Sequence, residues 1–384
     1  MSVLIRGGCV LRPDGTFEET DLAIKEGRLA SLGGAISRSQ WDAHGLLVLP
    51  GIVDLHGDAF ERQLMPRPGV HFPVDVALFD TDRQMVANGI TTAFHGLTWS
   101  WEPGLRGEAA AFSFIEGLDR LRGKLACDTR VHLRQETFNL SAERQILDWI
   151  AAGRISILAF NDHMDDIIKR REPAYGLKPY ADRSGLGLQE FDDLLRQVEE
   201  RAPKVPASVE KLADAARAAG VTLLSHDDGT PEQRLYYHNL GCAISEFPLN
   251  RETARSGRNL GSAIVMGSPN VMRGGSHCGG IAAAEAVREG LCDILTSDYY
   301  YPALLHAPFR LAREGACSLA EAWKLVSDNP ARAAGLSDRG TLEEGKRADL
   351  ILVDARDPAM PRVQAVFVGG KPVHAVSDAL GMLV

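Results

Sequence analysis

Hydrophobic and polar positions divide this chain into a long middle part and two shorter ends of a different texture. In the middle, from about Gly51 to about Leu336, eight short apolar runs are separated by stretches in which apolar residues recur every three or four positions. The first pattern is typical of buried strands and the second of amphipathic helices. The eight predicted strands are GIVDLHG, ITTAFHG, RVHLRQE, ISILAFN, VTLLSHD, CAISEFP, SAIVMGS and CDILTSD.

Eight strand–helix units predict an α/β fold, and a closed (β/α)8 barrel of the TIM type fits this number better than an open sheet. An open doubly wound sheet is the alternative, because it is built from the same units. Helical periodicity is clear in SVEKLADAARAAG and GGIAAAEAVREG. One connection, which includes residues 165–206, is unusually long. Insertions of this size over a barrel mouth often serve as lids or substrate loops.

The two ends of the chain resemble each other. Short β-type runs separated by turn residues fill the first part, as in VLIRGGCVLRPDG, and the same texture returns near the other end in RADLILVDARDP and RVQAVFVGGKPV. This predicts a small β-sandwich domain assembled from residues 1–48 and 340–384, with the barrel at residues 49–339.

The overall charge limits the kinds of partner. With 42 basic and 51 acidic residues, the formal net charge is −9. Nucleic acids and acidic membranes attract basic surfaces, so neither is an expected partner, although a local basic pocket for a small anionic substrate remains open. A small phosphorylated substrate is compatible with this charge, and the sequence is compatible with a homo-oligomer.

The six cysteines are scattered and form no CxxC pair, which is typical of a reduced, cytoplasmic protein. The N-terminal MSVLIRGGCVLRPDG lacks the features of a signal peptide. No apolar run approaches the ~18 residues of a membrane span. We therefore expect a cytoplasmic enzyme.

Six side chains that could bind a metal occur where an apolar run turns polar. In parallel barrels the chemistry lies at the C-terminal ends of the strands, so these side chains are predicted to converge. Imidazoles and carboxylates together suit a divalent cation that activates water; zinc fits, and manganese or iron is compatible. The six candidates are His56, Asp58, Glu136, His163, His226 and Asp298.

Spacing and residue type suggest roles for several of these residues. His56 and Asp58 are two apart, so on a regular strand both face the same way. Glu136 shares a face with His132 and Arg134, and a glutamate there could bridge two cations. Asp298, after the last predicted strand, is the candidate general base. One or two metal ions remain open.

A glycine-containing loop after the seventh predicted strand is a candidate anion site. Adjacent glycines let backbone N–H groups approach an anion, and a helix N-terminus favours negative charge. The loop comprises Arg273, Gly274, Gly275, Ser276 and His277. Arg67, in the rigid Met65–Pro68 loop, and Tyr299, beside Asp298, are further candidates for substrate binding.

Several motifs resemble the amidohydrolase superfamily: LPGIVDLHGD, ANGITT and the C-terminal NPARAAGL and RGTLEEGKRADLILVD. Within it, MPRPGV, SHDD, EFP, NVMRGGSH and TSDYYYPALL are similar to the diphosphatases of bacterial phosphonate degradation, and they run in order through nearly the whole chain. The resemblance implies hydrolysis of a ribose 1-alkylphosphonate 5-triphosphate to the 5-phosphate and diphosphate. It also implies that the six candidate ligands hold or serve the metals, while Arg273 and its loop neutralise phosphates.

The chain departs from the family pattern at three places. The first strand reads His-Gly-Asp-Ala where those diphosphatases have His-Thr-Asp-Asn. The second strand continues FHGLTWSWEPGLR, which we expect to bring His95, Trp99 and Trp101 near the mouth. Superfamily histidines usually come from strands five and six, whereas His163 falls on strand four. Either one strand is miscounted or His163 is not a ligand, with Glu246 on strand six as its rival.

Two other classes of function stay open. An amidohydrolase acting on a C–N bond, such as a cyclic amide or a deaminase-type substrate, would use the same metal chemistry with fewer cationic groups in the pocket. A non-catalytic binding partner in phosphonate processing is the third possibility, and the presence of every candidate ligand argues against it.

Overall fold

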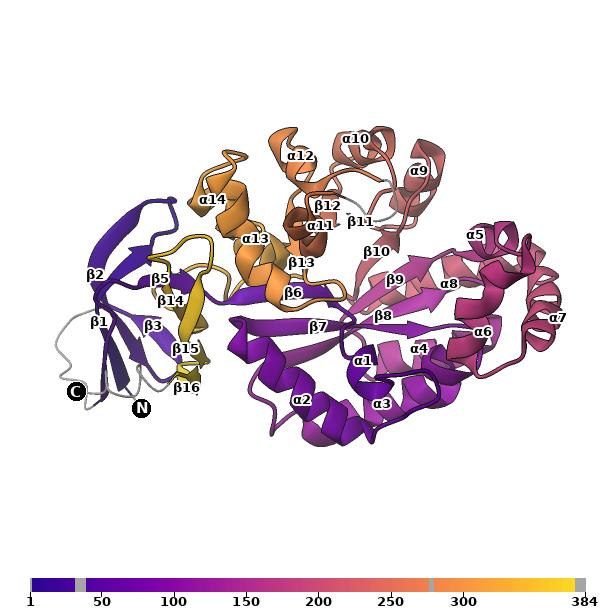
Figure 1. The fold of residues 1–384 in the computed structure, drawn as a ribbon, viewed down its shortest axis with the longest axis horizontal. Coiled ribbons are helices and arrows are strands. Elements are labelled where there is room, and N and C mark those ends of the chain that lie inside the picture. The colour runs from indigo at the N-terminus through magenta and orange to yellow at the C-terminus, as the bar shows by residue number, and fades with distance from the viewer. Residues whose placement is uncertain (1, 32–38, 276–279, 377–384) are drawn as a thin grey trace.

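The computed structural model describes residues 2–31, 39–275 and 280–376. Two eight-stranded sheets make up its β-structure, one built from the middle of the chain and one from both ends. The terminal sheet lies at one end of the molecule beside the central sheet, and helices surround the central sheet (Figure 1). No helix within the described ranges is long and apolar enough to cross a membrane.

The central sheet is a parallel barrel. Its strands pair strictly in chain order, which excludes the doubly wound alternative, where the order of strands reverses. Closure between the last and first strands uses the Gly57–Asp298 bridge, with Asp298 N–H donating to the His56 carbonyl over 2.9 Å. All eight predicted strands are confirmed: β6 (Ile52–Gly57), β7 (Ile90–Trp99), β8 (Asp128–Glu136), β9 (Ile157–Asn161), β10 (Thr222–His226), β11 (Ile244–Glu246), β12 (Ala263–Gly267) and β13 (Ile294–Thr296).

One buried apolar cluster fills the inside of the barrel. It takes side chains from every strand of the barrel except β8, among them Phe94, Leu224 and Val265. On β8, Val131 and Leu133 pack outward against the helices, so the alternating His132, Arg134 and Glu136 point inward. A polar row therefore replaces apolar filling on this one strand, as the alternation in VHLRQE predicted.

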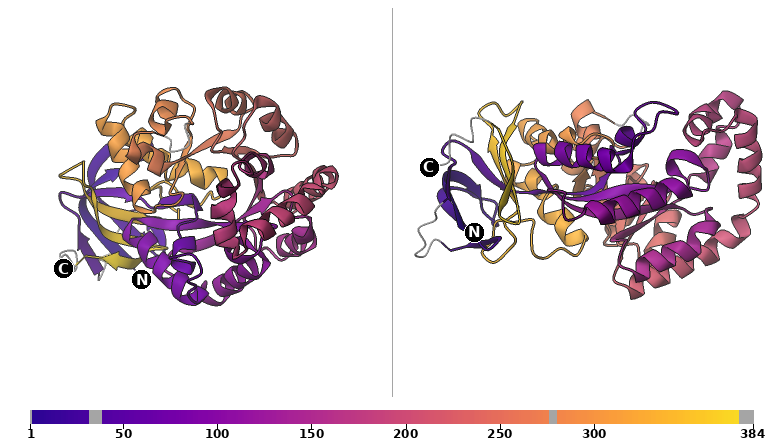
Figure 2. Two further views of the ribbon diagram at one scale, coloured as in Figure 1. Left: turned by 45° about the vertical axis from the view of Figure 1, so that its right-hand side comes forward. Right: turned by 90° about the horizontal axis from the view of Figure 1, so that it is seen from below.

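Helices cover the outside of the barrel. The predicted helix at SVEKLADAARAAG is α8, and the one at GGIAAAEAVREG is α12. The α-helices of the described residues are α1 (Glu61–Leu64), α2 (Val74–Ala87), α3 (Glu108–Leu121), α4 (Glu143–Ala151), α5 (Met164–Lys169), α6 (Lys178–Ser184), α7 (Leu188–Glu199), α8 (Val205–Ala218), α9 (Pro231–Asn239), α10 (Arg251–Asn259), α11 (Ser268–Arg273), α12 (Ala283–Arg288), α13 (Pro302–Arg313), α14 (Leu319–Lys324) and α15 (Asp328–Ala333). The long connection between β9 and β10 carries α5, α6 and α7 at the end of the molecule away from the terminal sheet (Figure 2).

Both ends of the chain contribute to the second sheet, as predicted. Its path runs β16-β15-β14-β5-β1-β2-β3, with β4 paired to β1. Trp41 and Phe367, from opposite ends of the sequence, meet edge to face with ring centroids 5.2 Å apart. The strands are β1 (Ser2–Leu11), β2 (Phe17–Lys25), β3 (Arg28–Ala30), β4 (Ser39–Asp42), β5 (Leu47–Pro50), β14 (Leu350–Asp354), β15 (Arg362–Val368) and β16 (Lys371–Ala375). The division of the chain at residues 48 and 339 stays a prediction.

The second strand carries side chains where the sequence did not place them. His95 lies behind β7 between Phe60 and Phe114, with ring centroids 5.6 and 5.5 Å away, and Trp99 packs on Trp149 at 5.0 Å. Because alternate residues of a strand face opposite sides, both belong to the layer between strands and helices. Trp101 stacks on Phe191 of α7. The expectation that the side chains lie near the mouth is therefore wrong for His95 and Trp99, and none of the three is among the described residues that line the cavity.

The burial of His95 can be tested by measuring how the free energy of unfolding changes at acidic pH. Neither of its ring nitrogens has a hydrogen-bond partner among the described residues, and burial lowers its pKa to about 4. An unfolded histidine titrates near 6.5, so between pH 6.5 and 4 the unfolded state binds a proton at His95 and the folded state does not. As pH falls from 6.5 to 4, the wild type should lose up to about 3 kcal/mol of unfolding free energy relative to His95→Leu.

Urea denaturation at several pH values measures this difference. His71→Leu, at an exposed loop position, serves as the control. A wild-type and a His95→Leu protein that lose stability in parallel on acidification would show that the His95 imidazole has a partner or is protonated in the fold.

Candidate metal centre

Three side chains from three strands form the deepest part of a cluster at the C-terminal end of the barrel. His56 Nδ1 lies 2.8 Å from Glu246 Oε2, and His226 Nε2 lies 3.8 Å from the same oxygen. The imidazoles of His56 and His226 have centroids 5.6 Å apart. Glu246 is fully buried. Strands β6, β10 and β11 thus bring together residues that are up to 190 positions apart in the chain.

A second group lies nearer the surface. His163, which immediately precedes α5, places Nδ1 2.6 Å from Glu136 Oε1 and Nε2 3.2 Å from Asp227 Oδ2. Asp227 Oδ2 is also 3.0 Å from His226 Nδ1. His226 therefore joins both groups. The contact with Glu136 orients the His163 ring, and the metal-bridging role expected for Glu136 stays a prediction.

Asp58 and Asp298 face His56 on its other side. The distance from His56 Nε2 to Asp58 Oδ2 is 3.9 Å, and one atom of each of the three side chains lies within 4.8 Å of the others. Arg134 reaches into this group: its Nη1 donates to Asp58 over 3.2 Å, and its Nη2 lies 3.1 Å from His226 Nε2. Since a guanidinium only donates, His226 Nε2 must be the acceptor and unprotonated.

The donor set fits a divalent cation. Three overlapping groups of imidazole and carboxylate atoms are close enough to share an ion: His56 with His226 and Glu246, His163 with His226 and Asp227, and His56 with Asp58 and Asp298. His132 Nε2 and Glu246 Oε1 are buried without a hydrogen-bond partner among the described residues. Buried polar atoms normally have partners, so unpaired donors and acceptors here are consistent with a site for a metal.

Glycines allow the close approach of these groups. A Cβ on Gly96 would lie 3.2 Å from His56 Nε2, and one on Gly267 would lie 3.0 Å from Asp298 Oδ2. On Gly57 a Cβ would meet Tyr301 at 2.8 Å and Ser297 Oγ at 2.9 Å. The glycine in His-Gly-Asp-Ala is thus required by its surroundings in this chain, because any larger residue would displace them.

The buried carboxylates set the protonation of the imidazoles. Burial alone would lower the pKa of His56, but Glu246 and Asp58 outweigh it and raise that pKa to about 10. Burial would raise the pKa of Glu246, yet His56 and His132 bring it down to about 2. Glu136, against the opposing effect of burial, raises the pKa of His163 to about 10. Each pair is therefore an ion pair when no metal is bound, and a cation would replace the imidazole proton.

Asp298 differs from the other carboxylates. Burial, reinforced by the charge of Asp58, raises its pKa to about 7. Its backbone adopts a left-handed conformation with φ of 54°, which is uncommon outside glycine. The preceding Ser297 holds this turn, since its N–H and Oγ–H both donate to the buried Asp54, over 3.0 and 2.5 Å. A carboxyl tuned near neutral pH and held rigidly suits a general base.

The strand count confirms the prediction that places His163 after strand four, His226 on strand five and Glu246 on strand six. No strand was miscounted. His163 and Glu246 are not equivalent rivals, because Glu246 lies in the buried group with His56, while His163 lies in the outer group with Asp227. His132, Arg134 and Asp227 belong to the site although the sequence did not single them out as ligands. Alternation in VHLRQE and the SHDD motif were the available signals.

Glu246 is expected to contribute to metal affinity. Glu246→Gln keeps the shape but removes the charge that orients His56, so affinity for a divalent cation should fall about 10- to 100-fold. Isothermal titration of zinc into metal-free wild-type and variant protein measures the change, with Glu190→Gln on α7 as the control. Unchanged affinity in Glu246→Gln would remove Glu246 from the centre and leave His163 as the remaining candidate.

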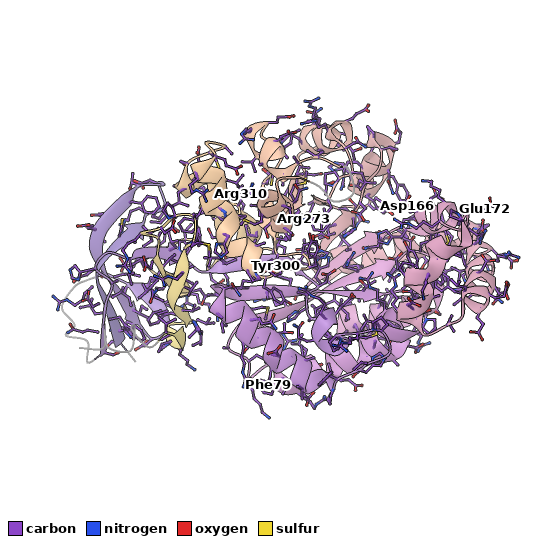
Figure 3. All side chains as sticks on the ribbon, in the orientation of Figure 1. Phe79, Asp166, Glu172, Arg273, Tyr300 and Arg310 are labelled. Carbon is purple, nitrogen blue, oxygen red and sulfur yellow. The ribbon has the colours of Figure 1, made fainter. Side chains whose placement is uncertain are left out.

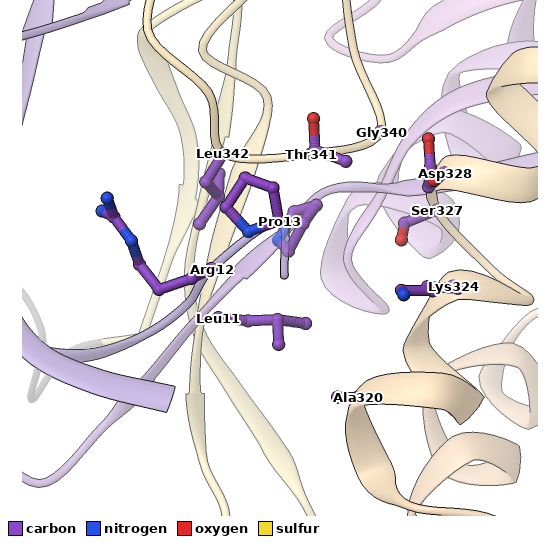
Figure 4. A pocket seen from close by; sticks show the side chains of 11 residues that line it. Leu11, Arg12, Pro13, Ala320, Lys324, Ser327, Asp328, Gly340, Thr341 and Leu342 are labelled. Atoms are coloured by element: carbon purple, nitrogen blue, oxygen red, sulfur yellow. The ribbon is translucent and has the colours of Figure 1, made fainter. Parts of the chain in front are cut away.

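A cavity of about 560 Å³ opens above the cluster. Its wall includes His56, Asp58, His163, His226 and Asp298, together with Asp166, Arg170 and Tyr180 from the connection between β9 and β10. A second hollow, between β1 and α14 on the N-terminal side of the barrel, holds only about 20 Å³, room for one water (Figure 4). A third, of about 380 Å³, lies between the terminal sheet and residues 342–344. The 560 Å³ cavity is the one that the candidate metal ligands line, so it is the candidate place for a substrate, and the insertion borders it.

The described part of the glycine loop, Arg273 to Gly275, lies at the C-terminal end of a helix, so the helix N-terminus predicted for the anion site is wrong for these residues. Arg273 is the last residue of α11, and Gly274 is its left-handed C-cap with φ of 80°. The N–H groups of Gly274 and Gly275 donate back to Val271 and Asn270 over 3.2 and 3.0 Å. These amides are consequently not available to an anion. Ser276 and His277 lie outside the described residues.

The predicted arginines lie at the edge of the site. Arg273 is exposed and its Nη1 is 3.5 Å from the Tyr299 hydroxyl, and Tyr299 lines the cavity. Figure 3 shows Arg273 on α11 and Asp166 on the insertion. Arg67 is exposed in its loop and accepts a backbone hydrogen bond from Val70 over 3.0 Å. Neither Arg67, in an exposed loop, nor Arg273, at the end of α11, is among the described residues that line the cavity.

Comparison with known proteins agrees with this site. The chain is 34% identical over 350 residues to alpha-D-ribose 1-methylphosphonate 5-triphosphate diphosphatase of Escherichia coli (strain K12), covering 88% of this chain and 91% of that protein. It is 24% identical over 361 residues to adenine deaminase 2 of Desulfotalea psychrophila (strain LSv54 / DSM 12343), covering 91% of this chain and 53% of that protein.

Solved structures share the fold. A prolidase complexed with N-methylphosphonate-L-proline superposes with a TM-score of 0.64 at 14% identity, covering 98% of this chain and 100% of that one. A D-hydantoinase has a TM-score of 0.61 at 15% identity, covering 98% and 95%. Residues 83–374 match the amidohydrolase family. Taken with the barrel and the cluster at its mouth, these matches show that the chain belongs to the amidohydrolase family.

Proposed function

We propose that this metal-dependent hydrolase acts in phosphonate catabolism and cleaves a ribose 1-alkylphosphonate 5-triphosphate to the 5-phosphate and diphosphate. The observation that carries the proposal is the 34% identity, over nearly the full length of both chains, to a diphosphatase of that specificity. The mixed imidazole and carboxylate cluster beneath a 560 Å³ cavity supports it, because such a site can activate water beside a phosphorylated ligand.

The residues of the cluster would have different roles in the reaction. One or two divalent cations, with zinc as the proposed ion, would be held by His56, Asp58, His226 and Glu246, and by His163 and Asp227 in the outer group. Such a cation acts as a Lewis acid toward water and phosphoryl oxygen. Asp298 accepts the proton of the attacking water on its carboxylate, as its pKa near 7 allows. Glu136 and Asp227 fix the orientation of the His163 ring.

Cleavage of a C–N bond is the second candidate. It is favoured by the likeness to adenine deaminase 2, although this chain spans about half the length of that protein. The same cluster could activate water for attack on a carbon centre. In either case we propose a cytoplasmic enzyme with a small-molecule substrate.

Product analysis separates the two functions. Zinc-loaded protein is incubated with ribose 1-methylphosphonate 5-triphosphate and, separately, with adenine and hydantoin. Phosphorus NMR should show diphosphate together with the 5-phosphate, and no ammonia or ring-opened product should form from the nitrogen compounds. Release of orthophosphate alone, or turnover of a nitrogen compound only, would contradict the proposed function.

A further inference from the structure

Helix α5 presents one stripe of polar residues to the cavity. His163, immediately before the helix, Asp166 and Arg170, at its C-terminal end, are three and four positions apart, so they lie on one helical face. All three line the cavity. At 1.5 Å per residue, Arg170 lies about 10 Å beyond His163 along the helix axis. The stripe therefore runs from the metal cluster along the wall of the cavity.

The Arg170 side chain has no hydrogen-bond or ion-pair partner among the described residues. Three other cations of the insertion are engaged by carboxylates. Lys169 pairs with Asp166 at 3.2 Å, Arg171 with Asp192 at 2.7 Å, and Arg183 with Glu102 at 2.5 Å. The ion pair with Lys169 partly neutralises the negative charge of Asp166. Asp166 therefore does not cancel the positive charge of Arg170.

The other arginine of the cavity wall is not free. Arg134 is already engaged by Asp58 and His226 at the metal cluster. Of the described residues that line the cavity, Arg170 is thus the guanidinium that remains for a ligand. A guanidinium offers a planar fork of donors that matches the oxygens of a phosphate or phosphonate.

Tyr180 supplies a second polar group to the cavity wall. It lines the same cavity from α6. Its ring is held from behind by the Arg183 guanidinium, 4.7 Å from the ring centroid, and by Phe191, stacked at 6.0 Å. A ring fixed in this way keeps its hydroxyl in one direction, and a phenol can donate to an oxyanion.

We infer that Arg170 and Tyr180 form an anion subsite on the cavity wall beyond the metal cluster, which holds a terminal phosphorus oxyanion of the substrate while the bond to be cleaved lies at the metals. The inference rests on the proposed function for the identity of the substrate. That oxyanion is either the terminal phosphate of the triphosphate chain or the phosphonate on the ribose. Both are tetrahedral, carry negative charge and need the same donors.

Equilibrium binding tests the subsite without depending on turnover. Zinc-loaded wild type, Arg170→Gln and Arg170→Lys are titrated calorimetrically with inorganic diphosphate and, separately, with methylphosphonate, at a fixed free zinc concentration. Arg196→Gln is the matched control, since Arg196 lies on α7 of the same insertion, is exposed, and shares Asp192 with Arg171. Arg170→Gln should weaken one ligand about 10-fold, with partial recovery in Arg170→Lys, and Arg196→Gln should change neither.

The two ligands distinguish the two sources of the oxyanion. Weaker diphosphate binding alone assigns the subsite to the triphosphate end, and weaker methylphosphonate binding alone assigns it to the phosphonate end. Unchanged binding of both ligands in Arg170→Gln, or an equal loss in Arg196→Gln, would overturn the subsite. Failure of the proposed function appears separately, as a lack of diphosphate release by the wild type.

Discussion

Asp298→Asn is expected to lower turnover at least about 100-fold, the usual scale for losing a positioned general base, while leaving fold and metal content intact. The carboxylate lies in the group with His56 and Asp58, and its pKa near 7 lets it take up a proton under the conditions of the reaction. Asparagine preserves the shape and tolerates the left-handed backbone, since it is among the residues enriched at positive φ. The substitution thus removes the base alone.

The measurement is the rate of diphosphate release at saturating substrate, with zinc content determined on the same sample. Asp293→Asn is the matched control because Asp293 directly precedes β13 at the opposite end of the strand. It should retain most of the turnover. Near-native rates in zinc-replete Asp298→Asn would exclude Asp298 as the base.

Asp228→Asn is expected to lower the free energy of unfolding by about 3–5 kcal/mol, the range for breaking a buried ion pair from one side. Asp228 and Arg234 are both fully buried, with Oδ2 and Nη1 3.1 Å apart. The same carboxylate oxygen accepts from the hydroxyls of Ser225 and Ser245 over 2.7 and 2.9 Å. Removing the carboxylate charge leaves the Arg234 guanidinium buried without compensation.

Urea denaturation at a fixed zinc concentration measures the loss. The double variant Asp228→Asn/Arg234→Met removes both charges and should recover at least half of it, because the uncompensated charge is gone. Equal stabilities of the two variants would show that the cost arises from packing. A wild-type-like Asp228→Asn would mean that water or another group reaches Arg234.

The Asp228 pair also shows where reading SHDD was incomplete. The motif alone does not show which of the two carboxylates after His226 supports its imidazole. Asp227 lies 3.0 Å from His226 Nδ1, whereas Asp228 turns away to Arg234. Asp227 has a left-handed backbone with φ of 57°, which turns the chain between the two residues. Such a local backbone conformation depends on tertiary packing. The sequence alone therefore does not show which of two adjacent aspartates contacts the histidine.

The RGGSH loop shows a similar limit. Adjacent glycines serve equally well before a helix, where their amides are free, and after one, where they close the last turn. In this chain α11 occupies residues 268–273, so Gly274 ends a helix and the amides are used internally. Arg170, by contrast, had no motif to mark it. Its relation to His163 becomes visible only once residues 164–169 are known to form a helix.

The sequence by itself determined the barrel, its eight strands in order, the shared terminal sheet and the positions of the metal-binding candidates. These follow from periodicity and from the rule that parallel strands present their C-terminal ends at one edge, both of which act locally or by topology alone. Only the tertiary structure decided that Glu246 joins His56, that Glu136 supports His163, that Arg134 enters the cluster and that His95 and Trp99 face away from it. Those outcomes depend on distances between side chains from different strands, and a one-residue change of register or a single left-handed residue reverses them.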